Sequence, residues 1–170
     1  MLDRLRFAKA DAMLNLISNY VQVSSSLYFK NVHVAYCTSM LRMYNLQGEY
    51  TKALKYASKK LDLLETIRED TGQASQKLCS AYTEKAMALI GTGHFSEEEI
   101  LPMLQTSTKI RIALPGYQRT QLFNALRCEG TLYKKMGRLK EAEACYLKAY
   151  EDRVAELGDE KLHTNIRFVS

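Results

Sequence analysis

Residues 130–149 read GTLYKKMGRLKEAEACYLKA, and two apolar helical patterns meet in them at one glycine. Apolar side chains recur at helical spacing on both sides of Gly137, and a small residue, Gly130 or Ala142, stands within each apolar stripe. Small residues let the axes of two antiparallel helices approach closely, while the larger tyrosines of the stretch fill the wider gaps between them. The segment therefore predicts a closely packed helix pair with a tight turn at the central glycine.

The same arrangement recurs along the chain. Gly48, Gly93 and Gly137 are separated by 45 and 44 residues, and each has a helix-period segment before and after it. A glycine at this place closes one helix and opens the turn to the next, because it adopts the left-handed conformation without steric cost. A fixed period of this size indicates an array of stacked helical repeats.

The third copy resembles the tetratricopeptide repeat at nearly every signature position, namely Gly130, Tyr133, Gly137, Leu139, Ala142, Tyr146 and Ala149. Its continuation to Thr164 is similar to the longer repeats of kinesin light chains and of fungal repeat arrays. The first copy matches more weakly. The second has Glu98 where a small residue is expected and also contains Pro102. The resemblance implies an all-α solenoid in which the first helix of each pair lines a concave groove.

We therefore expect one all-helical domain spanning residues 1–170, with about seven helices. The predicted parts are a leading helix, three antiparallel helix pairs and a short C-terminal tail, at residues 3–22, 26–69, 74–113, 118–157 and 158–170. Ser96 is expected to cap the second helix of the middle pair. Because an interior proline removes a backbone hydrogen bond, we expect this helix to be bent, or to begin late near Leu101.

Composition agrees with a helical globular protein and excludes several classes. Apolar residues make up 46% and charged residues 25%, with 8 Gly and 2 Pro, so a disordered chain and a many-stranded sheet are disfavoured. The net charge of +5 is spread along the chain, which argues against nucleic-acid binding. No signal peptide or membrane span is apparent, and the four cysteines have no zinc-type spacing. We expect a cytoplasmic or nuclear protein.

Catalytic motifs are not evident in the chain. No nucleophile elbow, zinc-protease motif or phosphate-binding glycine loop occurs, so no enzyme activity, cofactor or metal is expected. The acidic run Glu97 to Glu99 is explained by attraction to the helix dipole at a helix start.

The remaining place for function is the concave groove. The resemblance places there the residues Thr38, Arg42, Asn45, Thr83, Met87, Asn124, Arg127, Thr131, Lys134 and Lys135. This groove would be cationic at both ends and apolar in the middle, which suits a peptide with acidic flanks and a central apolar anchor. The alternative is that these cations are ordinary solvent-exposed charges that bind no partner.

The main hypothesis is thus a non-enzymatic adaptor that binds a protein or peptide partner. One alternative is an enzyme or small-molecule binder that uses the groove as a pocket. Another is a structural fragment of a larger repeat protein. A homodimer through the helix ends is also possible, since the apolar tail residues Leu162, Ile166, Phe168 and Val169 could cap the last pair or dock on another copy.

Overall fold

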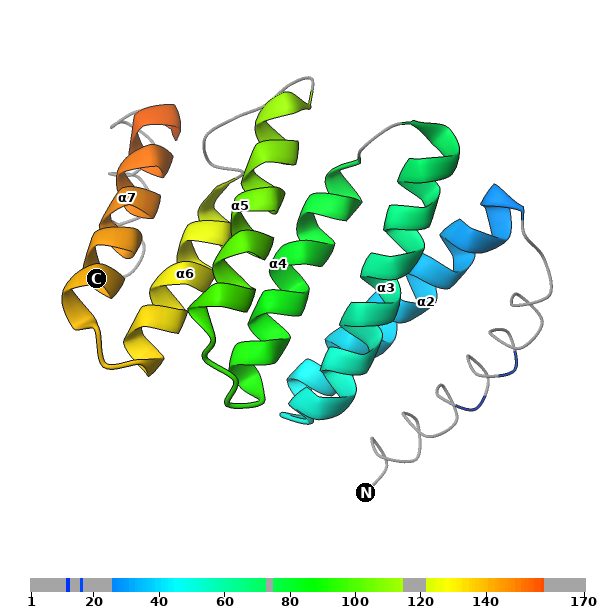
Figure 1. Ribbon diagram of the computed structural model, residues 1–170, viewed down its shortest axis with the longest axis horizontal. Helices are drawn as coiled ribbons and strands as arrows, with labels where there is room; N and C mark the ends of the chain where they lie inside the picture. The colour runs from blue at the N-terminus through cyan, green and yellow to red at the C-terminus, as the bar shows by residue number, and fades with distance from the viewer. Residues whose placement is uncertain (1–11, 13–15, 17–25, 73–74, 115–121, 158–170) are drawn as a thin grey trace, which may run out of the picture. The chain divides into compact units, whose positions relative to one another are not determined.

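The computed structural model describes residues 12, 16, 26–72, 75–114 and 122–157, with the backbone alone at 155–157. These residues form α-helices and no strand, which confirms the all-helical prediction (Figure 1). The helices are α2 (Leu27–Leu46), α3 (Tyr50–Thr71), α4 (Gln76–Gly91), α5 (Glu97–Ala113), α6 (Phe123–Lys135) and α7 (Leu139–Leu157). The expected leading helix at 3–22 lies outside the described residues except for Ala12 and Leu16, which are helical, and the tail at 158–170 lies outside them entirely.

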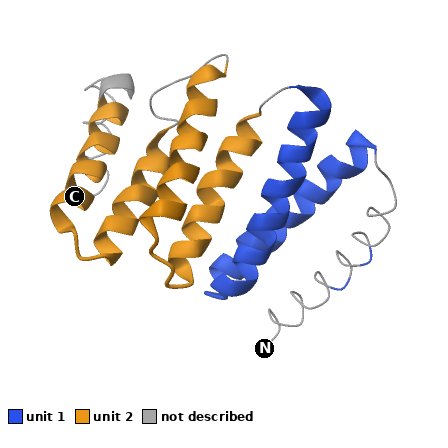
Figure 2. Cartoon of the chain, in the orientation of Figure 1, with its two compact units in different colours: residues 1–73 blue, residues 74–170 orange. Residues whose placement is uncertain are grey.

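The chain divides into two compact units, residues 1–73 and residues 74–170 (Figure 2). Unit 1 contains the pair α2–α3, and unit 2 contains the pairs α4–α5 and α6–α7. Each helix pair falls where the apolar periodicity predicts it. The expectation of a single domain stays a prediction.

In unit 1, α2 and α3 bury an aromatic and aliphatic core. Ala53 and Ala57 of α3 have no exposed surface, so the two helix backbones approach closely there. Tyr56 stacks on Tyr44 of α2, with ring centroids 5.6 Å apart, and its hydroxyl lies 3.3 Å from that of Tyr36. The contact between α2 and α3 thus combines small residues with a cluster of three tyrosines, whereas Tyr50, which the repeat pattern also assigns to packing, is 42% exposed.

Within each pair, the two helices are joined by the same turn. Gly48, Gly93 and Gly137 all have positive φ, at 71°, 87° and 78°. In each turn the glycine N–H donates to the carbonyl three residues back, and the next N–H donates to the carbonyl five residues back, at 2.9–3.1 Å. This is the Schellman motif, which satisfies the last carbonyls of a helix. The predicted role of the three glycines is confirmed.

Unit 2 stacks its two helix pairs through α6. Helix α6 packs against its partner α7 and also against both α4 and α5 of the preceding pair. Leu78, Ile100, Cys128 and Leu132 are fully buried in this arrangement. Such packing is consistent with a helical repeat, in which each pair covers the apolar side of its neighbour.

Of the two alternatives expected for helix α5, the late start is wrong, and the bend stays a prediction. The helix begins at Glu97 and does not begin late near Leu101, because Ser96 caps it by accepting a hydrogen bond from the Glu99 N–H at 3.3 Å. Pro102 lies on the exposed side of the helix, where the carbonyl that it leaves without a helical partner can reach water. The proline is therefore accommodated within the helix.

The register of α5 also explains why position 98 holds a glutamate where the repeat pattern expects a small residue. Helices α3 and α7 begin two residues after their turn glycine, whereas α5 begins four residues after Gly93. The fourth residue of all three helices is buried: Ala53, Ile100 and Ala142. The turn before α5 is two residues longer, so its packing stripe is displaced by two and Glu98 remains exposed.

The third pair packs largely as residues 130–149 predict. A methyl group at Gly130 would lie 2.8 Å from Cε1 of Tyr146, so the bare backbone of α6 makes room for this ring. Ala142 and Ala149 are buried against α6. Leu139, which the sequence assigns to the packing stripe, is instead 65% exposed, because it lies on the outer side of α7.

Candidate functional site

The candidate site is a row of polar and cationic side chains along α6. We call it the α6 stripe, and it consists of Asn124, Arg127, Thr131, Lys134 and Lys135. These residues recur at helical spacing and therefore share one face of α6. Asn124, Arg127, Lys134 and Lys135 are exposed, and Thr131 is half-buried. The opposite face of α6 supplies Ala125, Cys128 and Leu132 to the core, so burial of that face directs the stripe outward.

The cations of the α6 stripe are not neutralised within the described residues. Arg127, Lys134 and Lys135 form no ion pair with any carboxylate in the described ranges. Arg138, three residues beyond Lys135, differs from them. Its guanidinium contacts Glu97 at 2.5 Å, forms a bidentate pair with Glu141 and stacks over the Tyr133 ring at 4.6 Å. Arg138 is therefore structural, whereas the charges of the α6 stripe are available to a ligand.

Hydrogen bonds connect the α6 stripe to α7. The Thr131 hydroxyl donates to the carbonyl of Arg127 at 2.8 Å, and the Tyr146 hydroxyl lies 3.2 Å from the same Thr131 oxygen. Because the threonine proton is already donated, Tyr146 is the donor in the second bond. This arrangement fixes the tyrosine beside the stripe.

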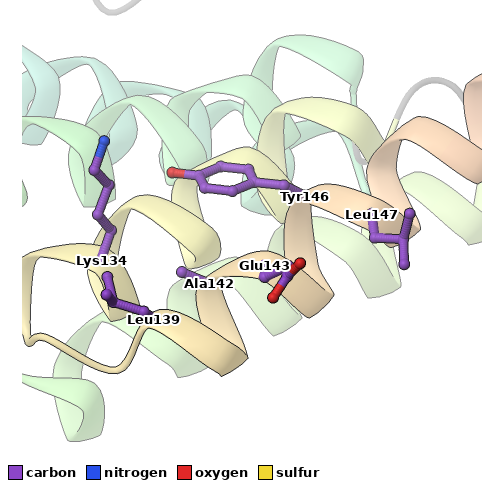
Figure 3. A pocket seen from close by; sticks show the side chains of 6 residues that line it. All are labelled: Lys134, Leu139, Ala142, Glu143, Tyr146 and Leu147. Atoms are coloured by element: carbon purple, nitrogen blue, oxygen red, sulfur yellow. The ribbon is translucent and has the colours of Figure 1, made fainter.

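A surface hollow of about 490 Å³ lies at the edge of the α6 stripe. Figure 3 shows the six side chains that line it, with the Tyr146 hydroxyl pointing toward the side of Lys134. Its lining residues are Lys134, Leu139, Ala142, Glu143, Tyr146 and Leu147. The hollow is mainly apolar, with one cation and one carboxylate.

Of the two groove residues expected on α4, only Met87 is accessible to a ligand. Met87 is half-buried, but Thr83 is buried, so its assignment to the groove is wrong. Its hydroxyl lies 3.1 Å from that of Ser107 in α5, and Ser107 donates to the carbonyl of Cys79 at 2.8 Å. The short threonine side chain fits against α5, where these polar partners compensate for its burial.

The groove residues expected on α2 belong to unit 1. Arg42 and Asn45 are exposed, and Thr38 is half-buried with its hydroxyl donating to the carbonyl of Val34 at 2.8 Å. Arg42 also lacks an ion pair within the described residues. The structure thus brings together the five predicted residues of α6, while those of α2 lie in the other unit.

The thiols near these surfaces are weakly nucleophilic. Burial raises the pKa of Cys128 to about 12 and that of Cys37 to about 11, and it also raises the pKa of Cys79 and Cys145. Such thiols stay protonated at neutral pH. Within the described residues, no group of three His, Cys, Asp or Glu side chains could hold a metal ion, and no helix has the length and apolar character needed to cross a membrane.

The outer side of α7 carries functional candidates that sequence reasoning missed. Leu139, Glu143, Tyr146, Leu147 and Tyr150 recur at helical spacing and leave much of their surface exposed. We call these five residues the α7 stripe. The signal was present as a second apolar periodicity beside the buried alanines, but the repeat pattern had already assigned Leu139 and Tyr146 to the core.

Comparison with known proteins found no match to the chain among protein-family models, curated proteins or solved structures.

Proposed function

We propose that this chain is a non-enzymatic adaptor built as an α-solenoid of tetratricopeptide-like helix pairs. Three helix pairs joined by the same Schellman turn at intervals of 45 and 44 residues support this assignment. The packing of α6 against both α4 and α5 also supports it, because stacked repeats bury their apolar sides in this way.

The proposed ligand is a peptide or helix of a protein partner, with acidic residues that contact the α6 stripe. The observation that supports this proposal is a set of three exposed cations on one face of α6, namely Arg127, Lys134 and Lys135, which form no ion pair with the described residues. Asn124 adds amide donors at one end of the stripe. An acidic segment would gain charge-assisted hydrogen bonds there without breaking any ion pair of the described residues. Met87 is half-buried on α4, which packs against α6, and in this proposal it supplies the apolar contact for the central anchor of the ligand.

A charge-reversal experiment tests this proposal. The variant Arg127→Glu, Lys134→Glu reverses the sign of the stripe's net charge. The matched control Lys140→Glu, Lys148→Glu makes the same change in net charge on exposed positions of α7. The probe is a fluorescent peptide with glutamate-rich flanks around one leucine. Because surface substitutions change stability by about 0.5 kcal/mol or less, melting curves should match the parent in both variants.

We expect the α6 variant to bind the peptide about tenfold more weakly than the parent, or worse, while the control retains parental affinity. Binding by the parent should weaken as salt is raised, since exposed charges are screened. Equal affinity of the two variants would mean that net charge alone attracts the peptide, and it would remove the α6 stripe from the mechanism.

A further inference from the structure

The α7 stripe is an apolar surface with an unpaired acidic centre. Leu139 is 65% exposed, Leu147 53% and Tyr150 56%, and the two leucines line the hollow of about 490 Å³. Glu143 stands in the middle of these residues and forms no ion pair with the described residues. An apolar helix face of this kind normally has a partner, because exposing several large side chains together is unfavourable.

The chain itself supplies a segment that matches this surface. Residues 158–170 follow α7 directly, and Leu162, Ile166 and Val169 stand at i, i+4 and i+7, which is the spacing of one helical face. Only Gly158, Asp159, Glu160 and Lys161 separate Leu162 from the end of α7. An extended connection from Leu157 to Leu162 spans up to about 17 Å. It can therefore carry Leu162 back beside α7 to the level of Tyr150, about 10 Å from the end of the helix.

We propose that residues 161–170 pack as a short amphipathic helix on the α7 stripe and fill its hollow. The span from Leu162 to Val169 would cover about 10 Å, compared with about 16 Å from Tyr150 back to Leu139. With Leu162 opposite Tyr150, Ile166 faces Tyr146 and Leu147, and Val169 comes opposite Glu143.

The charges favour the same register. In this arrangement Arg167 lies beside the apolar face of the segment, within one turn of the point opposite Glu143. An arginine side chain is long enough to reach a carboxylate across such a contact, and it can form a bidentate pair. This pairing would neutralise the one carboxylate of an otherwise apolar surface, which gives the segment a reason to prefer this position.

Disulfide trapping in the full chain tests the proposal. In a Cys145→Ser background, the pair Leu147→Cys with Ile166→Cys places two thiols across the proposed contact, and cysteine keeps most of the apolar character there. The control pair Lys148→Cys with Ile166→Cys differs by one residue on α7 but points to another face of the helix. Mild oxidation is followed by thiol counting and by mass on non-reducing gels.

We expect the Leu147 pair to close an internal disulfide at least about tenfold faster than the control, since only the first pair meets disulfide geometry. A covalent dimer as the main product would overturn the proposal and assign the α7 stripe to a second copy. Equal rates for the two pairs, or no cross-link in either, would overturn it as well.

Amide exchange provides a second test that leaves the apolar contacts intact. Glu143→Arg should speed exchange in α7 by about two- to fivefold, because it replaces an ion pair by two like charges. Adding Arg167→Glu to this variant should restore protection. If the double variant exchanges as fast as Glu143→Arg alone, the proposed register is wrong. None of these changes touches Arg127, Lys134 or Lys135, so the peptide-binding proposal is tested separately.

Discussion

Gly130 of α6 and the ring of Tyr146 in α7 are in such close contact that no side chain fits between them. A methyl group at Gly130 would lie 2.8–3.1 Å from three ring atoms of this tyrosine. The ring is also held at its far end by the hydrogen bond to Thr131, so moving it away breaks a polar contact. This glycine is therefore retained within a helix, where it costs about 1 kcal/mol relative to alanine.

Replacing Gly130 by a larger residue tests whether the Tyr146 ring requires a glycine at this position. We expect Gly130→Leu to lower the free energy of unfolding by about 1–3 kcal/mol, the cost of overpacking a helix contact. In a Tyr146→Ala background the same substitution should cost much less, because the ring no longer occupies the space. Urea unfolding of the four chains of this cycle provides the measurement. A cost that does not change with Tyr146 would show that another neighbour is responsible.

The position ten residues before the turn glycine behaves differently in each repeat. Thr38 is half-buried, Thr83 is buried against Ser107, and Arg127 is exposed. We expect Thr83→Arg to destabilise unit 2 by about 3 kcal/mol, since it forces a charge into a filled contact without a partner. Thr38→Arg should cost less than about 1 kcal/mol. Thermal melts of the two variants give the comparison. Equal melting temperatures would indicate that Thr83 is exposed at the surface.

His33 makes the stability of α2–α3 depend on pH. It is buried, and burial, aided by the nearby charge of Lys59, lowers its pKa from the ordinary 6.5. The unfolded chain therefore binds a proton at a higher pH than the folded chain does. Stability from this residue is present above about pH 6.5 and is lost as the pH falls toward the lowered pKa.

We expect the free energy of unfolding of the parent to fall more steeply below pH 6.5 than that of His33→Gln, which has no titrating ring. Urea unfolding from pH 5 to pH 8 measures the two slopes. Parallel curves for the two chains would contradict this role of His33. Above pH 7 the two curves should run parallel, which serves as the internal control.

The four thiols should differ in reactivity. Cys37, Cys79 and Cys128 are fully buried and Cys145 is half-buried, so we expect a thiol reagent at pH 8 to modify Cys145 first. The buried thiols should react only as the helix pairs open, and Cys128, whose pKa is raised to about 12, should react only at rates set by unfolding. Mass spectrometry of timed samples identifies the order. Early modification of Cys128 would indicate that α6 opens readily from its neighbours.

Local sequence rules predicted the helices well because each helix boundary depends on nearby residues. Ser26, Ser75 and Ser96 accept a hydrogen bond from the N–H three residues later, as helix N-caps do. The turn glycines adopt the left-handed conformation that their position requires. The repeat resemblance assigned five residues of α6 to a groove, and these residues lie together on the side of α6 opposite its buried face. That this face is a binding groove stays a prediction.

The register of α5 was not predictable by counting from the turn glycine. His94 and Phe95 lengthen this turn by two residues, and the displacement places Ile100 where the other pairs have alanine. A pattern measured from Gly93 alone cannot detect such an insertion, because the packing of α4 on α5 decides where the stripe begins.

The helix pairs and their turns could be predicted from the chain's residues, since they depend on side-chain periodicity and on backbone conformation. The contacts between helices were needed to show that Thr83 is internal, that Leu139 is exposed and that α7 presents a second apolar face. Thr83 became internal because Ser107 and the Cys79 carbonyl satisfy its hydroxyl in the contact with α5. Burial of a given position depends on which neighbouring helix covers it, and that neighbour lies far away in the sequence.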